Sequence, residues 1–235
     1  MDTIALLKNR RSLRAYDERP VPADVRRAVL EAAASAPTAG ALMLYAMIEI
    51  HDQTIKDELS HTCDEQPFIA KAPWLVLFVA DYQRLYESWL DRGMEPMREP
   101  GVGDLMLAVS DALIAAQTAV IAAEALGLGS CYIGDIIENM ERHQALLNLP
   151  RYTFPAALLC FGYPAENDNR GRIPRLPLEA VVHKDGYQKK DWLNSDWAMQ
   201  VSNKGLFKFD ADFSIEMTRS VKAWLDRWQQ GAAHG

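Results

Sequence analysis

Three arginines and a serine within five residues are the most chemically distinctive feature of this sequence. The segment reads Arg10-Arg11-Ser12-Leu13-Arg14. A guanidinium group presents a planar fork of N–H donors that matches phosphate oxygens, and a serine hydroxyl adds a neutral donor. In a chain of net charge −7, this cluster indicates a site for an anionic ligand group. A basic turn that only faces water has the same composition, so both interpretations stay open at this point.

One glycine-containing segment could place its backbone close to a flat ligand, and a second invites comparison with a dinucleotide-binding motif. The segment APTAGA (36–41) has mostly small side chains, so its amides could lie beneath an aromatic ring system; an ordinary helix-to-strand loop is the alternative. The segment GLGSCYIGD (127–135) follows an expected helix rather than a strand, and its glycines lack the GxGxxG spacing. The sequence therefore contains no Rossmann dinucleotide fingerprint.

Other common catalytic and metal-binding motifs are missing from the sequence. The five histidines form no HExxH motif, which argues against a zinc site, and no GxSxG nucleophile elbow occurs. Cys131 follows the glycine turn, but no histidine is near it, and a buried inert thiol is the more common role. Because no acid, base, nucleophile or metal set stands out, an enzyme of this sequence would need a cofactor to carry its chemistry.

Composition narrows the class of protein. The chain has 235 residues, 49% hydrophobic and 24% charged, with a pI near 5.3. These values are typical of a globular protein and argue against a nucleic-acid binder that relies on bulk positive charge. Three cysteines without a CxxC motif favour a reducing compartment. The N-terminus does not resemble a secretory signal and the apolar runs are interrupted by polar residues, so we expect a cytoplasmic protein without a membrane span.

Hydrophobic periodicity indicates an alternation of helices and strands. Two N-terminal helices are expected, one that ends at the proline-rich turn 18–22 and one over 24–36. Apolar runs at 46–50, 74–80 and 154–161 predict buried strands. A long buried helix is expected from Gly103 to the glycines at 127–129, and a docked terminal helix from Phe213. Residues 81–103 lack steady periodicity and predict a lid or insertion, with an ordinary surface excursion as the alternative.

A series of segments in this order resembles the nitroreductase family of FMN-dependent oxidoreductases. The series consists of a starting helix, RRSLRAY, a proline pair, a helix, APTAGALMLY, QPFIAKAPWLVLFVAD, the long helix with LGLGSCYIGDI, and GRIPRLPLEAVVH. The resemblance extends from about Leu6 to Tyr187 and is less specific from residue 188 onward.

This resemblance implies an α/β (α+β) fold with a central mixed, mostly antiparallel sheet flanked by helices. It implies a single domain over residues 1–235, with a C-terminal extension over 188–235. It further implies an intertwined homodimer with FMN at the dimer interface, to which the long apolar helix would contribute.

The resemblance also assigns FMN contacts residue by residue. Arg10, Ser12 and Arg14 fall at positions that hold the flavin phosphate and pyrimidine edge, and Arg11 borders the phosphate and ribose. Arg14 would polarise the flavin near N1 and the C2 carbonyl. The ring-facing Pro37, Thr38, Ala39 and Gly40 would come from the other protomer. The remaining implied contacts are the amide of Gln66, the backbone of Ile133 and Gly134, and Arg175 at the phosphate, with Arg172 as the weaker candidate.

One segment departs from the family pattern. Many members continue the ring-facing loop with asparagine and then glutamine, proline and tryptophan, where this chain has Ala41, Met43, Leu44 and Tyr45. The departure removes an amide contact at Ala41, while the implied phosphate contacts remain.

The activity implied by the resemblance is a ping-pong hydride transfer from NADH or NADPH, through FMN, to nitroaromatics or quinones. No metal is implied. Specialised flavin chemistry, such as dehalogenation or flavin fragmentation, and a non-catalytic flavin-binding protein are the alternatives. A structural protein that binds an anion through the arginine cluster, without flavin, is a further one.

Overall fold

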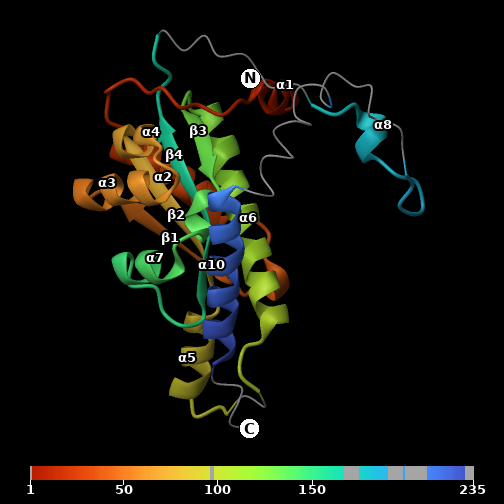
Figure 1. Cartoon of the computed structure of the whole chain (residues 1–235). Helices are drawn as coiled ribbons and strands as arrows, with labels where there is room; N and C mark the ends of the chain where they lie inside the picture. The colour runs from red at the N-terminus through yellow and green to blue at the C-terminus, as the bar shows by residue number, and fades with distance from the viewer. Residues whose placement is uncertain (1, 96–97, 167–174, 190–197, 199–210, 231–235) are drawn as a thin grey trace. The chain divides into compact units, whose positions relative to one another are not determined.

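The computed structural model describes residues 2–95, 98–166, 175–189, 198 and 211–230. The chain forms two compact units, residues 1–168 with 217–235 and residues 169–216, and each is described by itself. The first unit contains a β-sheet with helices on both faces (Figure 1). The expectation of a single domain over residues 1–235 stays a prediction.

The core of the first unit is a four-stranded sheet in the order β1-β2-β4-β3. Three of the strands, β1 (Tyr45–Ile50), β2 (Trp74–Asp81) and β4 (Thr153–Gly162), confirm the predicted apolar strands. The edge strand β3 (Gly129–Ile133) is not among the predicted ones. All described pairings of these strands are antiparallel, which corrects the expectation of a mixed sheet.

The two faces of the sheet carry separate helical layers, because side chains alternate along each strand. On one face Val76 and Phe78 pack with residues of α2 (Ala23–Ala34) and α6 (Val102–Ala125). On the other face Leu75 and Leu77 pack with residues of α3 (Gln53–Thr62), α4 (Pro67–Lys71), η2 (Asp135–Ile137), α7 (Met140–Leu146) and α10 (Asp212–Gln229). The central strands β2 and β4 are therefore covered on both sides, which explains their nearly unbroken apolar sequence.

The long helix α6 is closed by hydrogen bonds at both ends. At its start the Asp104 carboxylate accepts the N–H of Gly101 at 2.7 Å. At its end Gly127 has φ +81°, and the N–H of Leu128 donates to the carbonyl of Ala123 at 2.9 Å. Glycine adopts this left-handed conformation without strain, so the helix ends where the glycine signal predicts.

The two sides of α6 differ in exposure. A stripe of small residues, Ala108, Ala112, Ala115 and Ala119, is buried and allows close contact with the sheet. The opposite stripe is apolar yet 41–59% exposed, and consists of Met106, Leu107, Leu113 and Ile114. The prediction of a buried helix is therefore right for one face and wrong for the other. The length and hydropathy of α6 would also suit a membrane span, but the buried alanine stripe identifies it as a core helix.

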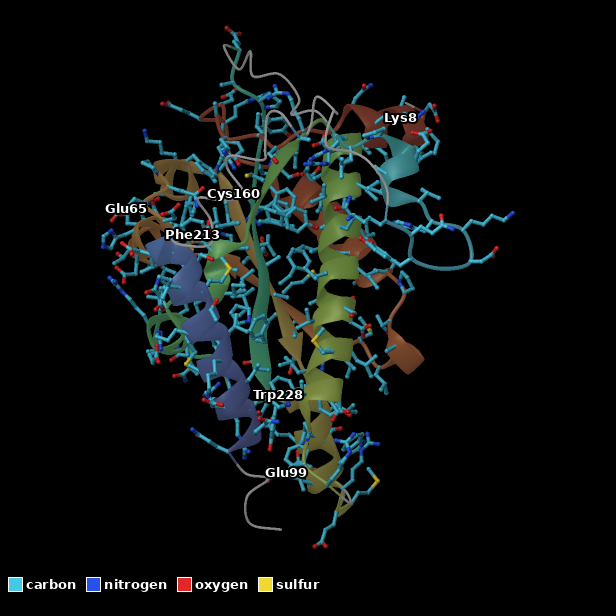
Figure 2. The ribbon with its side chains drawn as sticks, turned by 45° about the vertical axis from the view of Figure 1, so that its right-hand side comes forward. Lys8, Glu65, Glu99, Cys160, Phe213 and Trp228 are labelled. Atoms are coloured by element: carbon cyan, nitrogen blue, oxygen red, sulfur yellow. The ribbon has the colours of Figure 1, made fainter. Side chains whose placement is uncertain are left out.

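The C-terminal helix α10 confirms the predicted docked helix. Ser220, Trp224 and Trp228 recur every four residues and are buried. Trp228, labelled in Figure 2, contacts the ring of Tyr152 edge-on with centroids 5.5 Å apart. The Ser220 hydroxyl donates to the Ile137 carbonyl at 2.7 Å, which ties α10 to η2.

Two segments differ from the sequence expectations. The first helix, α1 (Thr3–Asn9), ends at Asn9 instead of continuing to the turn at 18–22, because the following residues dock on the sheet edge. The predicted lid region contains a helix, α5 (Gln83–Asp91). Two short helices, η1 (Ala39–Ala41) and, in the second unit, α8 (Leu178–Val181), are also present.

Candidate functional site

The arginine-rich segment lies beside β3, at the edge of the sheet. Ser12 forms an isolated parallel bridge with Ser130, and the N–H of Leu13 donates to the Ser130 carbonyl at 2.8 Å. Leu13 is buried, whereas Ser12 and Arg14 are exposed, as alternation along an extended segment requires. Docking of Leu13 therefore turns Ser12 and Arg14 outward, where a ligand can reach them.

Two glycines make this docking possible. Gly129 and Gly162 are directly opposite each other on β3 and β4. A Cβ on Gly129 would lie 2.5 Å from Leu13 Cδ2, and a Cβ on Gly162 would lie 2.7 Å from Tyr16 Cδ1. Both distances are far below a van der Waals contact, so a side chain at Gly129 would displace Leu13, and a side chain at Gly162 would displace Tyr16 and Pro73. Neither glycine has a local signal in the sequence that indicates this role.

Arg10 carries a buried donor without a partner. Its Nη1 atom is buried and has no hydrogen-bond partner among the described residues. Burial raises the pKa of Glu124, and it raises the pKa of Tyr132 to about 12. The positive charge of Arg10 lowers both pKa values in part, so the guanidinium lies near both side chains. Arg11 acts on the pKa of Glu124 in the same way. Since an unpaired buried donor is costly, this position fits an anionic group such as a phosphate.

Gln66 and Gly134 are brought together by one side-chain hydrogen bond. Gln66 Nε2 donates to Asp135 Oδ2 at 2.7 Å and to the Cys63 carbonyl at 2.8 Å. Gly134 precedes Asp135 and is exposed, with open space beside its Cα. Ile133 is buried at the end of β3, so it can offer a ligand only its backbone. Because Nε2 donates within the chain, the carbonyl oxygen Oε1 is what Gln66 can offer a ligand.

A buried histidine supports this corner of the molecule. His143 Nδ1 lies 2.9 Å from the Ile136 carbonyl, and Nε2 lies 2.7 Å from Thr62 Oγ1. Burial lowers the pKa of His143, so the ring is neutral near pH 7, with Nδ1 as donor and Nε2 as acceptor. The contacts join η2, which follows Gly134, to α3, which precedes Gln66. Sequence reasoning considered this histidine only as a metal ligand and missed the positioning contact.

Arg14 reaches the same corner from the N-terminal segment. Its Cζ lies 5.5 Å from the centroid of the Phe68 ring. Phe68 is on α4, which begins directly after Gln66. The structure therefore gathers Arg14, Gln66 and Gly134 around the ends of α4 and β3.

The loop that was predicted to face a ring, residues 37–40, lies beside a different part of α6 from Arg10. Asp111, buried to 2% exposure, accepts the N–H of Ala39 at 2.9 Å and the N–H of Leu44 at 3.1 Å. Glu124, beside Arg10, is on the same helix and about 20 Å away at a rise of roughly 1.5 Å per residue. Within one chain the structure therefore does not bring Ala39 to Arg10. Asp111 is a positioning residue that sequence reasoning missed.

The conformation of this loop depends on contacts from two elements. Gly40, Ala41 and Met43 have φ values of +55°, +58° and +51°, a conformation that costs energy for alanine and methionine. Thr38 Oγ1 accepts the Met43 N–H at 3.2 Å. The Arg84 guanidinium, from α5, donates to the Met43 carbonyl. The loop is thus held in a single shape.

The predicted site residues fall into two groups. One surrounds the docked N-terminal segment and consists of Arg10, Arg11, Ser12, Arg14, Gln66, Ile133 and Gly134. The other is on the loop held by Asp111 and consists of Pro37, Thr38, Ala39 and Gly40. Arg172 lies outside the described residues, and Arg175 is exposed in the second unit, so their assignments stay predictions.

The cysteines are free and buried. Cys131 and Cys160 face each other across β3 and β4. Burial raises the pKa of the Cys63 and Cys160 thiols, which makes both poor nucleophiles. In the described ranges, no group of three or more His, Cys, Asp or Glu side chains is arranged to hold a metal ion.

Comparison with known proteins agrees with the fold and with the order of the segments. The sequence profile of the nitroreductase family matches residues 7–163. The oxygen-insensitive NADPH nitroreductase of Salmonella typhimurium is 36% identical over 227 residues, covering 96% of this chain and 87% of the relative. Nitroreductase A from Vibrio parahaemolyticus has a TM-score of 0.76 at 26% identity, covering 94% of this chain and 90% of that chain.

A further likeness concerns the fold alone. The NADPH:FMN oxidoreductase from Vibrio harveyi, complexed with NAD+, has a TM-score of 0.83 at 24% identity, covering 96% of this chain and 98% of that chain. Because the family profile matches most of the chain, and because the Salmonella relative aligns over nearly its whole length, this chain belongs to the nitroreductase family.

Proposed function

We propose that this protein is a cytoplasmic, FMN-dependent oxidoreductase that takes electrons from NADPH or NADH and passes them to small electron-poor acceptors such as nitroaromatics or quinones. The proposal is carried by the Nη1 atom of Arg10, which is buried without a hydrogen-bond partner among the described residues, in a cluster of arginine and serine side chains in a chain of the nitroreductase family. FMN, when bound, supplies the chemistry, because its ring accepts a hydride from a nicotinamide and donates electrons to an acceptor.

Arg10, Arg11 and Ser12 would hold the FMN phosphate. Guanidinium forks and a hydroxyl are suitable donors for phosphate oxygens, and a bound phosphate would satisfy the orphaned donor of Arg10. Arg175, with Arg172 as the weaker candidate, would close this site. These four arginines would place positive charge around a doubly charged group.

Arg14, Gln66, Ile133 and Gly134 would hold the flavin ring. Arg14 would place a cation near the C2 carbonyl, where negative charge on the ring is stabilised electrostatically. Gln66 would accept a hydrogen bond through Oε1, since its Nε2 is engaged with Asp135. Ile133 and Gly134 would contribute backbone N–H groups, which agrees with the buried side chain of one and the open space beside the other. The side chains of this site thus bind and orient.

An intertwined homodimer is the second part of the proposal. Loop residues 37–40 are about 20 Å from Arg10 along α6, so one chain does not present both groups to a single ring. A second copy could supply the missing loop if the exposed apolar stripe of α6 packs in a two-fold interface. The second unit has exposed apolar side chains as well, and these are Leu178, Val181 and Val182.

Leu113→Glu tests this interface. Leu113 is 41% exposed in a single chain, and a charge there would be buried without a partner in a dimer. We expect sedimentation to give a monomer and the purified variant to lose bound FMN, because each site would lose its second loop. Leu90→Glu, on the exposed side of α5, is the matched control and should stay dimeric. A dimeric Leu113→Glu variant with normal FMN content would contradict the proposed interface.

Residues 81–103 are proposed to shape the acceptor site. Their helix α5 contributes Arg84, which holds the Met43 carbonyl in the loop that would face the ring. A substitution in α5 that moves Arg84 would therefore alter the conformation of the loop through this hydrogen bond, which supports a role of residues 81–103 in substrate selection.

An absorbance spectrum before and after nicotinamide tests the function directly. We expect flavin bands in the purified protein, and bleaching of these bands on anaerobic addition of NADPH or NADH. Bands that do not bleach would contradict a reductase and favour a flavin-binding protein without catalysis. Bleaching without turnover of nitroaromatics or quinones would favour specialised flavin chemistry. Absence of flavin after incubation with FMN would contradict the proposed cofactor.

A further inference from the structure

A hollow of about 320 Å³ lies between the N-terminal segment and α4. Arg14, Ala15 and Tyr16 line one side, and Phe68 and Lys71 line the other. Lys71 is the last residue of α4 and is exposed. The resemblance to the family assigns a role to Arg14 but none to Lys71, so the second cation of this hollow needs its own explanation.

Both cations of the hollow lack an acidic partner among the described residues. Within the ranges that the structure describes, neither Arg14 nor Lys71 forms an ion pair. Two acidic residues that are close in sequence to the lining are engaged elsewhere, because Asp17 pairs with Arg19 and Glu65 with His61. Asp135, from another part of the chain, accepts a hydrogen bond from the Gln66 amide.

The other lining residues add no negative charge. The Tyr16 hydroxyl donates to the Leu13 carbonyl at 2.8 Å, and burial raises the pKa of Tyr16, so the group stays neutral. The Arg14 guanidinium lies over the face of the Phe68 ring in a cation–π contact. The described lining of the hollow therefore contains two cations and no anion, in a chain whose net charge is −7. Such a local positive field attracts anions.

We propose that Arg14 and Lys71 together form a subsite for an anionic group, a phosphate or a carboxylate, on one substrate of the enzyme. The inference rests on the proposed function, because it places the hollow beside the flavin that Arg14 would border. The Arg14 guanidinium has five N–H donors, so it can bond an oxygen of the anion as well as the flavin carbonyl, and the Lys71 ammonium group adds a mobile point charge.

Two substrates could carry this anionic group. NADPH has a 2′-phosphate that NADH lacks, and an aromatic acceptor can carry a carboxylate. Calorimetric titration with adenosine 2′-monophosphate and with 4-nitrobenzoate, after incubation of the protein with FMN, separates the two sources without requiring turnover. Adenosine and methyl 4-nitrobenzoate are the matched neutral ligands.

We expect one of the two anions to bind more tightly than its neutral analogue, and Lys71→Gln to weaken binding of that anion by about five- to tenfold. Lys71→Arg keeps the charge and should retain the preference. Lys222→Gln removes an exposed lysine charge from α10 and should leave the preference as in the wild type. The corresponding kcat/KM ratio, NADPH to NADH or 4-nitrobenzoate to its ester, should fall by the same factor in Lys71→Gln.

Equal binding of anion and neutral analogue in both pairs would overturn the subsite. The subsite would also be overturned if Lys71→Gln lost FMN affinity and bound all four ligands more weakly by the same factor, because Lys71 would then contribute to FMN binding. If neither nucleotide bleaches the wild-type flavin, the proposed function fails, while the titrations still decide whether Arg14 and Lys71 bind an anion.

Discussion

Replacing Arg10 with alanine is expected to weaken FMN binding by about 1.5 to 3 kcal/mol, roughly 10- to 150-fold in Kd. The Nη1 atom of Arg10 is buried without a hydrogen-bond partner in the described part of the chain, so a bound phosphate would satisfy it. A charge-assisted contact in a partly buried place is weakly screened by water, which makes its loss large. Quenching of FMN fluorescence on titration with the protein measures the change.

Arg27→Ala is the matched control for Arg10→Ala. It removes an exposed guanidinium of α2 that pairs with Glu31 one turn away, and its FMN affinity should equal that of the wild type. Arg10→Lys keeps a charge without the planar fork and should give an intermediate Kd. If folded Arg10→Ala binds FMN as tightly as Arg27→Ala does, the assignment of Arg10 to the phosphate is wrong.

Replacing Asp111 with alanine is expected to lower the free energy of unfolding by about 3 to 5 kcal/mol and to reduce FMN binding. The Asp111 carboxylate is 2% exposed and accepts N–H groups from Ala39 and Leu44. Alanine would leave both donors without an acceptor, and the positive φ values of Ala41 and Met43 would lose one of the contacts that maintain them. Urea denaturation followed by circular dichroism measures the loss, and FMN titration of the folded variant measures the effect on the site.

Two further variants make this result specific. Asp111→Asn keeps the shape of the side chain but exchanges one acceptor for a donor, so we expect about half of the destabilisation. Asp226→Ala removes an exposed carboxylate that pairs with Lys222 and should change the free energy of unfolding by less than about 0.5 kcal/mol. A loss below about 1 kcal/mol in Asp111→Ala would show that Thr38 and Arg84 hold the loop without Asp111.

The elements that sequence reasoning predicted correctly are those with a strong local pattern. The buried strands β2 and β4 are long apolar runs, α6 is an apolar helix with a glycine at its end, and α10 has tryptophans at helical spacing. The strand β3 was missed because its residues, GSCYI, have neither an apolar run nor a clear alternation. Its strand conformation depends on pairing with β4.

The end of helix α1 at Asn9 likewise depends on contacts with residues that are distant in sequence. The charged segment after Asn9 has no local signal that ends a helix, and the expected helix therefore ran on to the turn at 18–22. The extended conformation after Asn9 is stabilised by contacts with Ser130 and by the space above Gly129, more than 100 residues away in sequence. No local pattern reports contacts at that separation.

For the site, the sequence by itself determined the chemistry on offer: arginines and a serine for an anion, small residues and backbone for a flat ring, and no acid, base or metal set. Those properties belong to residue types and short spacings. Tertiary structure alone decided which groups meet, through hydrogen bonds between Gln66 and Asp135, Thr62 and His143, and Ala39 and Asp111, which join residues 69 to 81 positions apart. The resemblance already assigned the loop of Ala39 to the other protomer, but the distance between Arg10 and Ala39 within one chain is set by helical rise and packing, which no sequence spacing encodes.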